Sequence, residues 1–160
     1  QLGTKYTESM KMTYLDENGE RKVPIMGCYG IGIGRAMASA VEANHDDYGP
    51  IWPFAIAPWH IHICALGGNE QMKKFADELY EKLLSEGYEV IYDDREVSAG
   101  VQFSDADLLG VPYRVIFGAK NYEKGLAEIA SRDKKFKKLV PLGELEQELK
   151  AIIAEEKAKL

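Results

Sequence analysis

Two stretches of the sequence combine residue types that could do chemistry. In the first, residues 30–35, Gly30, Gly32 and Gly34 alternate with two isoleucines and Arg35 follows. If this stretch is a strand, the three glycines share one face, because strand side chains alternate between faces. A flat ligand such as adenine could approach that bare backbone, and the Arg35 guanidinium could bind a phosphate. A closely packed strand followed by a surface arginine explains the pattern equally well.

The glycine spacing matches neither common nucleotide-binding motif. The dinucleotide fingerprint has two residues before its last glycine, and the phosphate loop ends in Gly-Lys-Ser or Gly-Lys-Thr. Residues 30–35 have neither feature, so their spacing alone does not identify a nucleotide site.

The second stretch mixes carboxylates, an arginine and an aromatic ring between an expected strand and helix. Carboxyl ends of strands in open α/β sheets commonly bind ligands. An arginine suits the acceptors of guanine, an aspartate can accept from its N–H groups, and a phenylalanine can stack on a base. A solvated strand end, a capping carboxylate and core packing of the ring are the alternatives. The candidate residues are Asp93, Asp94, Arg95, Gln102, Phe103, Asp105 and Asp107.

For three other patterns, packing or exposure to solvent explains the residues at least as simply as a functional role does. Lys120 follows an expected strand and could contact a phosphate or only solvent. His60 and His62 would share a strand face, but no further ligands stand at suitable spacing, so we expect packing under a helix and no metal site. The basic run 132–138 could touch an RNA backbone, although a charged hairpin turn is the simpler interpretation.

Composition indicates an ordinary globular chain. Its 160 residues are 46% hydrophobic and 29% charged, with 15 glycines and 6 prolines. Without an apolar run of about 20 residues or a signal-peptide start, we expect a soluble, cytoplasmic protein. Cys28 and Cys64 form no C-x-x-C pair and are expected to be reduced. The net charge of −6 argues against non-specific coating of nucleic acid, but it does not exclude selective RNA binding.

The chain divides into two parts, with an expected boundary between residues 48 and 49. In the first part, Asn18-Gly19 predicts a tight hairpin turn between strands at 11–15 and 21–26. The glycine stretch and an alanine-rich helix at 36–44 follow. Residues 45–50 read as a polar linker.

From residue 51 onward, strands and helices alternate. This order predicts parallel strands joined by right-handed crossovers. The fold class is therefore α/β, a three-layer α/β/α domain with a mixed sheet of about five strands, preceded by a β-hairpin and a strand–helix segment. Strands are expected at 59–66, 88–93, 112–117, 126–132 and 137–141, and helices at 69–85, 103–109 and 143–159.

Residues 26–35, which read MGCYGIGIGR, resemble motif 3 of class II aminoacyl-tRNA synthetases, in the wording found in bacterial prolyl-tRNA synthetases. The resemblance covers essentially the whole chain. It implies that residues 1–48 are the end of a catalytic domain and that 49–160 are an anticodon-binding domain, so we expect a carboxy-terminal fragment. Further matching segments are 2–8, 51–53, 56–58, 93–95 and 105–112.

The resemblance also implies roles for single residues near the start of the chain. Arg35, as the motif 3 arginine, would contact ATP and is the catalytic candidate, with Gly30, Gly32 and Gly34 shaping the adenine floor. Thr4 and Lys5 would line the pocket for ATP or proline. Gly34 stands where the family often has a serine or an acidic residue, which loosens the local contacts expected there.

In the second part, the resemblance places the proline tRNA anticodon on the cluster from Asp93 to Asp107 and on Lys120. The parent enzyme is expected to be a cytoplasmic homodimer that uses ATP with Mg²⁺ to activate proline and transfers it to tRNA. Motifs 1 and 2 and the editing domain are missing, so we expect no proline activation, and no cofactor, in this fragment. A stand-alone protein-interaction module and an independent nucleotide-binding α/β enzyme are the alternatives.

Overall fold

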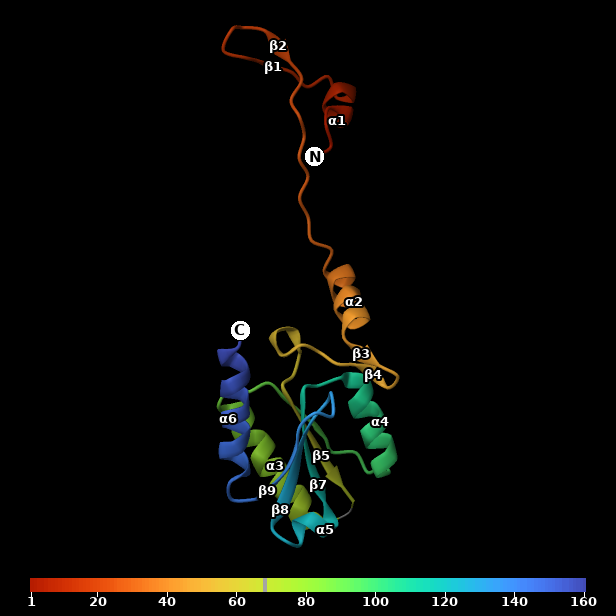
Figure 1. Cartoon of the computed structure of the whole chain (residues 1–160), viewed down its shortest axis with the longest axis vertical. Helices are drawn as coiled ribbons and strands as arrows, with labels where there is room; N and C mark the ends of the chain where they lie inside the picture. Colours follow the sequence, from red (N-terminus) through yellow and green to blue (C-terminus); the bar gives the residue numbers. More distant parts are fainter. Residues whose placement is uncertain (68) are drawn as a thin grey trace. The chain divides into compact units, whose positions relative to one another are not determined.

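The computed structural model describes residues 1–67 and 69–160 (Figure 1). These residues form two compact units, Gln1–Met37 and Ala38–Leu160, and each is treated separately below. Within the described residues, no helix is both long enough and apolar enough to cross a bilayer.

The first unit contains the expected hairpin in a shorter form. Strand β1 (Tyr14–Leu15) pairs antiparallel with β2 (Arg21–Lys22), and Gly19 in the turn has a φ of 77°. Glycine adopts this left-handed conformation without steric cost. Pro24, shortly after β2, has no N–H to extend the ladder, which accounts for the short pairing. A short helix, α1 (Lys5–Ser9), precedes the hairpin.

The predicted glycine strand is wrong. Residues 27–32 have no regular secondary structure, and helix α2 (Ile33–Ala43) begins before Gly34, so that Gly34 and Arg35 lie in its first turn. A strand needs a neighbour to accept and donate its backbone hydrogen bonds. None of the described strands pairs with this segment, so the alternation of glycines does not create a flat, side-chain-free face.

The second unit begins with the end of α2 and a small hairpin where a polar linker was expected. Strands β3 (His45–Asp46) and β4 (Gly49–Pro50) pair antiparallel, and the expected boundary at 48/49 falls in their turn. Gly49 has a φ of 141°, and a Cβ added there would lie 2.8 Å from the carbonyl oxygen of Asp107. The hairpin is therefore closely packed against its own unit.

A five-stranded mixed sheet forms the centre of the second unit, as predicted. Its order is β6-β5-β7-β8-β9. Strand β5 pairs parallel with both β6 and β7. Strand β8 pairs antiparallel with both β7 and β9. The strands are β5 (Ile61–Leu66), β6 (Val90–Asp93), β7 (Tyr113–Gly118), β8 (Leu126–Ser131) and β9 (Lys137–Pro141).

Helices cover both faces of this sheet, which confirms the three layers. Figure 1 shows α3 (Glu70–Ser85) and α6 (Leu145–Ala158) on one face and α4 (Ala99–Leu109) on the other. Asn69 caps α3 as expected, because its side chain accepts from the Met72 N–H at 3.1 Å. A 3-10 turn (Phe54–Ile56) and α5 (Ala119–Tyr122) were not predicted.

Helix α4 begins four residues earlier than predicted. Ser98 is its N-cap and accepts from the Val101 N–H. Gly100 lies in the first turn, and because glycine is a weak helix former it hides the start of the helix in the sequence. The helix ends as expected at Gly110, whose φ is 68°.

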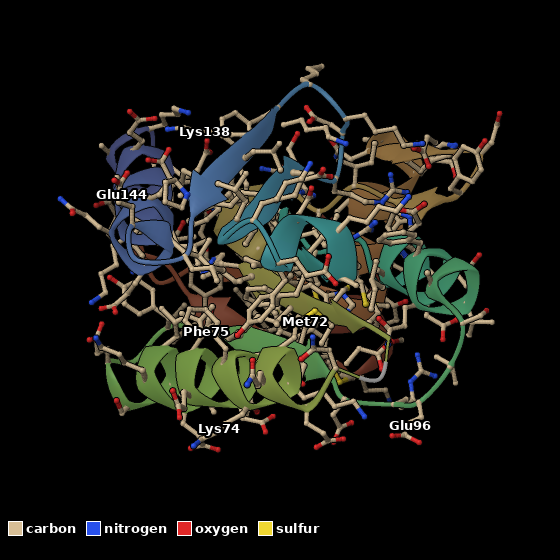
Figure 2. The ribbon with its side chains drawn as sticks, turned by 90° about the horizontal axis from the view of Figure 1, so that it is seen from below. Met72, Lys74, Phe75, Glu96, Lys138 and Glu144 are labelled. Carbon is tan, nitrogen blue, oxygen red and sulfur yellow. The ribbon has the colours of Figure 1, made fainter. Side chains whose placement is uncertain are left out.

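The main core lies between the sheet and the α3/α6 face. Figure 2 shows Met72 and Phe75 of α3 directed toward the sheet and Lys74 directed away from it. Phe117 is fully buried and meets the rings of Phe75 and Tyr122 edge to face. The helical spacing of apolar residues therefore decides which side of α3 packs on the strands.

We predict that Phe117→Ala lowers the free energy of unfolding by about 3–5 kcal/mol, because it removes a buried ring and leaves a cavity. Urea denaturation followed by circular dichroism measures the change. Lys74→Ala, at a side chain that is 78% exposed, is the control and should change stability by less than about 0.5 kcal/mol. Equal effects of the two substitutions would contradict this description of the core.

Candidate nucleic-acid interface

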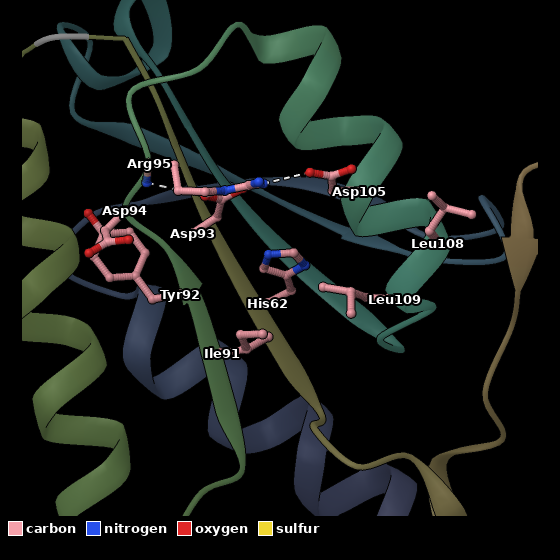
Figure 3. A pocket seen from close by; sticks show the side chains of 9 residues that line it. All are labelled: His62, Ile91, Tyr92, Asp93, Asp94, Arg95, Asp105, Leu108 and Leu109. Carbon is pink, nitrogen blue, oxygen red and sulfur yellow. Dashed lines mark hydrogen bonds and ion pairs between the residues drawn. The ribbon is translucent and has the colours of Figure 1, made fainter.

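Three of the predicted anticodon residues form one ion-paired cluster at the end of β6. The Arg95 guanidinium donates to both oxygens of Asp93 at 2.8 Å and to Asp105 Oδ2 at 2.7 Å (Figure 3). Asp93 is buried, and its hydrogen bonds from Arg95 hold the pKa of its carboxyl below the ordinary value. Gln102 lies beneath and donates to the Arg95 carbonyl oxygen at 3.1 Å.

This geometry changes the interpretation of Arg95. Its Nε and one terminal nitrogen already donate hydrogen bonds to the carboxylates of Asp93 and Asp105. These bonds use three of the five N–H groups of a guanidinium whose side chain is 50% exposed. The cluster therefore ties the end of β6 to α4, and base reading by Arg95 stays a prediction. Asp94, next to it, is exposed.

The remaining predicted helix residues lie on another side of α4. Phe103 and Asp107 are one turn apart, and Arg114 of β7 contacts both. Its guanidinium carbon is 5.6 Å from the centre of the Phe103 ring, and its NH2 donates to Asp107 Oδ1 at 2.7 Å. The structure thus separates Asp107 from Asp105 and brings it together with an arginine that we had not predicted.

Arg114 escaped prediction because it lies in an otherwise apolar strand. Alternation along β7 was the available signal: Val115 and Phe117 are buried in the core, so Arg114 and Ile116 belong to the opposite face. A charged residue on that face of a central strand indicates that the face is not fully covered.

These residues line a groove of about 320 Å³ beside α4, over β7 and β8. Four cationic side chains line it against two carboxylates, although the whole chain has a net charge of −6. Two aromatic rings, Phe103 and Phe136, also line it. Cations for phosphate and rings for bases are the ordinary components of a single-stranded RNA site. The cations are Arg114, Arg132, Lys134 and Lys137, and the carboxylates are Asp107 and Glu128.

Arg132 fixes the floor of this groove. The basic run 132–138 lies around the turn between β8 and β9, as the simpler interpretation held, but Arg132 itself is only 3% exposed. It donates to both Asp46 oxygens at 2.8 and 2.7 Å, and to the carbonyl oxygens of Asp107 and Gly49 at 3.1 and 3.2 Å. One buried guanidinium therefore joins the β3–β4 hairpin, α4 and the β8–β9 turn.

The other predicted residues are not members of either cluster. Lys120 is exposed on α5. Thr4 donates to Glu8 Oε1 at 2.6 Å, and the Lys5 ammonium lies 5.6 Å from the Tyr6 ring centre. His60 stacks on Phe54 with ring centres 4.0 Å apart.

The glycine segment of the first unit is open. Residues 27–35 are all exposed, and a Cβ added at Gly30 or Gly34 would meet nothing within 4 Å. The exposed apolar side chains include Tyr29 at 93% and Ile31 at 83%. These residues alone do not enclose ATP, so any nucleotide site here needs further walls.

Comparison with known proteins gives the family. A family model described as "Anticodon binding domain" matches residues 55–152, which contain both clusters of α4. The chain belongs to the anticodon binding domain family. The proline–tRNA ligase of Bacillus pumilus (strain SAFR-032) is 51% identical over 132 residues, and that of Thermoanaerobacter sp. (strain X514) is 43% identical over 155 residues.

These matches cover most of the present chain but only about a quarter of each relative's length. They cover 82% and 96% of the chain, but only 23% and 27% of the two ligases. A crystal structure of prolyl-tRNA synthetase from Cryptosporidium parvum, complexed with L-proline and AMP, has a similar fold, with a TM-score of 0.71 at 22% identity. The likeness covers 99% of this chain and 35% of that one.

We predict that Asp46→Asn lowers the free energy of unfolding most above pH 5 and less at lower pH. The hydrogen bonds from Arg132 lower the pKa of Asp46 far below the value near 4 of an unfolded aspartate. This stabilisation is fully present above the unfolded pKa and is lost as the pH falls toward the folded pKa. The urea midpoints of the wild type and of Asp46→Asn, measured between pH 3 and 7, should approach each other as the pH falls. A difference that stays constant with pH would contradict the ion-pair account.

Proposed function

We propose that this chain is the tRNA-reading part of a bacterial-type prolyl-tRNA synthetase and that it binds the anticodon of proline tRNA. The observation that carries the proposal is the Phe103–Arg114–Asp107 arrangement in a basic, aromatic groove of an otherwise acidic chain. The family of residues 55–152 and the proline–tRNA ligases among its relatives support the choice of RNA.

The groove offers each contact that a splayed guanine requires. The Phe103 ring gives a face on which a base stacks. Arg114 donates to the O6 and N7 acceptors of guanine, and the Asp107 carboxylate accepts from its ring and amino N–H groups. The existing 2.7 Å bond between these two side chains holds them in place before RNA arrives, which reduces the ordering cost of binding.

Lys134 and Lys137 supply charge for the RNA backbone. Both are exposed, and Lys137 is paired with Glu128 at 2.9 Å. Phosphate contacts of this type add affinity without sequence preference and weaken with salt. Six predicted residues rank below these in the proposal because they do not line the basic, aromatic groove: Asp93, Asp94, Arg95, Gln102, Asp105 and Lys120.

For the parent enzyme we propose activation of proline by ATP with Mg²⁺ and transfer to tRNA, in a cytoplasmic homodimer. Residues 1–48 would belong to its catalytic domain and 49–160 to the tRNA-reading domain. Arg35 and the glycines beside it would contact ATP once further segments wall the site, since they stand open here. No cofactor is assigned to the present chain alone.

An RNA stem-loop with the proline anticodon should bind at least about 10-fold more tightly than one with both anticodon guanines replaced, since each base contact is worth about 1–3 kcal/mol. Fluorescence anisotropy at 100 and 200 mM salt measures both affinities. Arg114→Gln should reduce this discrimination to less than about 3-fold. Equal affinity of the wild type for the two RNAs would refute the proposed function.

Two variants separate stacking from specificity. Phe103→Leu should weaken both RNAs alike, by about 5- to 100-fold, because stacking is tolerant of sequence. Lys74→Ala, on α3 and outside the groove, is the matched control and should change neither affinity. If Phe103→Leu bound RNA as the wild type does, the ring would be a packing residue only.

We predict no proline-dependent exchange of pyrophosphate into ATP by this chain. Class II activation needs motif 2 and the rest of the catalytic sheet, and the glycine segment here is open, without walls around it. A radioactive pyrophosphate assay with proline and Mg²⁺–ATP measures this, with a full-length synthetase as positive control. Exchange above background would contradict the account of residues 1–48.

A further inference from the structure

A second cavity lies on the side of α4 turned away from the RNA groove. Its volume is about 410 Å³, within the range of about 300–1,000 Å³ usual for small-molecule sites. Figure 3 shows His62 between the Asp93–Arg95–Asp105 cluster and Leu109. The cavity is lined by strands β5 and β6 below and by α4 at the side.

His62 is the observation that points to a ligand. It is only 2% exposed, and its buried Nδ1 has no hydrogen-bond partner among the described residues. A buried polar atom without a partner costs about 1–3 kcal/mol, so a group that satisfies it would be bound favourably. His62 is also one of the residues that line the cavity, so its imidazole is within reach of a ligand there.

The imidazole is neutral at physiological pH. Burial, with the positive charges of Arg114 and Arg95 acting in the same direction, lowers the pKa of His62 to about 4. A neutral ring offers one acceptor nitrogen and one N–H donor. It therefore suits an uncharged heterocycle edge or an amino group, and it does not serve as an anion-binding cation.

The remaining lining sets the shape and charge of the ligand. Ile91, Leu108 and Leu109 give apolar walls, and Asp94 and Asp105 add carboxylates. With Asp93, the lining has three carboxylates against the single guanidinium of Arg95. Apolar walls favour a flat ring, and the excess of acceptors favours N–H donors and disfavours anions.

We propose that this cavity binds a small planar molecule that carries an amidine or an exocyclic amino group, and that it is a site separate from the RNA groove. The inference is independent of the proposed tRNA function, because it depends on His62 and its own cavity. Benzamidine, adenine and benzoate serve as probes of the same size class with different charge and hydrogen-bonding groups.

The test is a titration of the full chain with each probe, followed by NMR of the Leu108, Leu109 and His62 signals. Benzamidine and adenine should bind saturably with a Kd of about 1 mM or tighter, and benzoate at least about 10-fold more weakly. His62→Phe, which keeps the ring volume but removes both nitrogens, should weaken adenine by about 3- to 10-fold. No saturable binding, or equal binding of benzoate, would overturn the proposal.

A second variant guards against misfolding of the buried substitution. Leu108 is 62% exposed, so Leu108→Trp should fold normally and occupy the cavity, with loss of probe binding. Unchanged adenine affinity in both His62→Phe and Leu108→Trp would also overturn the proposal. Competition with the anticodon stem-loop identifies the source of the ligand: displacement of benzamidine assigns the site to an RNA base, and its absence assigns it to a free small molecule.

Discussion

The second unit depends most on the buried guanidinium of Arg132. Removing a charged group from water costs several kcal/mol, and only complete hydrogen bonding offsets that cost. Here both oxygens of Asp46 and two backbone carbonyls accept from the side chain, and the backbone N–H of Arg132 donates to the Pro112 carbonyl oxygen at 2.8 Å. The side-chain partners come from the β3–β4 hairpin and from α4, so the guanidinium holds its full set of bonds only when both are in their native places.

This constraint reaches the proposed RNA-binding groove through Asp107. The backbone of Asp107 is held by Arg132, and its carboxylate is shared with Arg114, which in turn lies over Phe103. The groove is thus organised by bonds to the interior, and not by its exposed lysines. Helix α4 separates this groove from the His62 cavity. Phe103 and Asp107, one turn apart, line the groove, whereas Asp105, Leu108 and Leu109 line the cavity on another side of the helix.

Periodicity and capping in the sequence predicted most of the fold correctly. The apolar spacing of α3 identified its buried face, because this pattern expresses burial itself, whereas β5 is buried on both faces despite its alternation of isoleucine and histidine. The glycine stretch failed for a different reason. A strand is defined by its partners, and alternation at 30–34 carries no information about whether a partner is present. The prediction of a linker at 45–50 was also wrong, because Asp46 pairs with a buried arginine and two short strands form there.

The candidate site was predicted only in part, for related reasons. Asp105 and Asp107 look equivalent in the sequence, but a helix rotates residues two apart to different sides. Arg95 and Arg114 are both ion-paired with aspartates of the same unit, but only Arg95 stands in a polar stretch that the sequence pattern could single out. Arg132 lies in a run of surface charges, and nothing in its neighbours marks it as the buried member.

Two glycines limit how this part of the molecule can change over evolutionary time. Any Cβ at Gly49 would strike the Asp107 backbone, and one at Gly110 would lie 2.4 Å from the carbonyl oxygen of Pro50. Both positions also have left-handed φ values, so the hairpin and the end of α4 meet as bare main chain. Substitution at either glycine would force the two backbones apart. We therefore expect both glycines to stay unchanged during evolution while the residues around them vary.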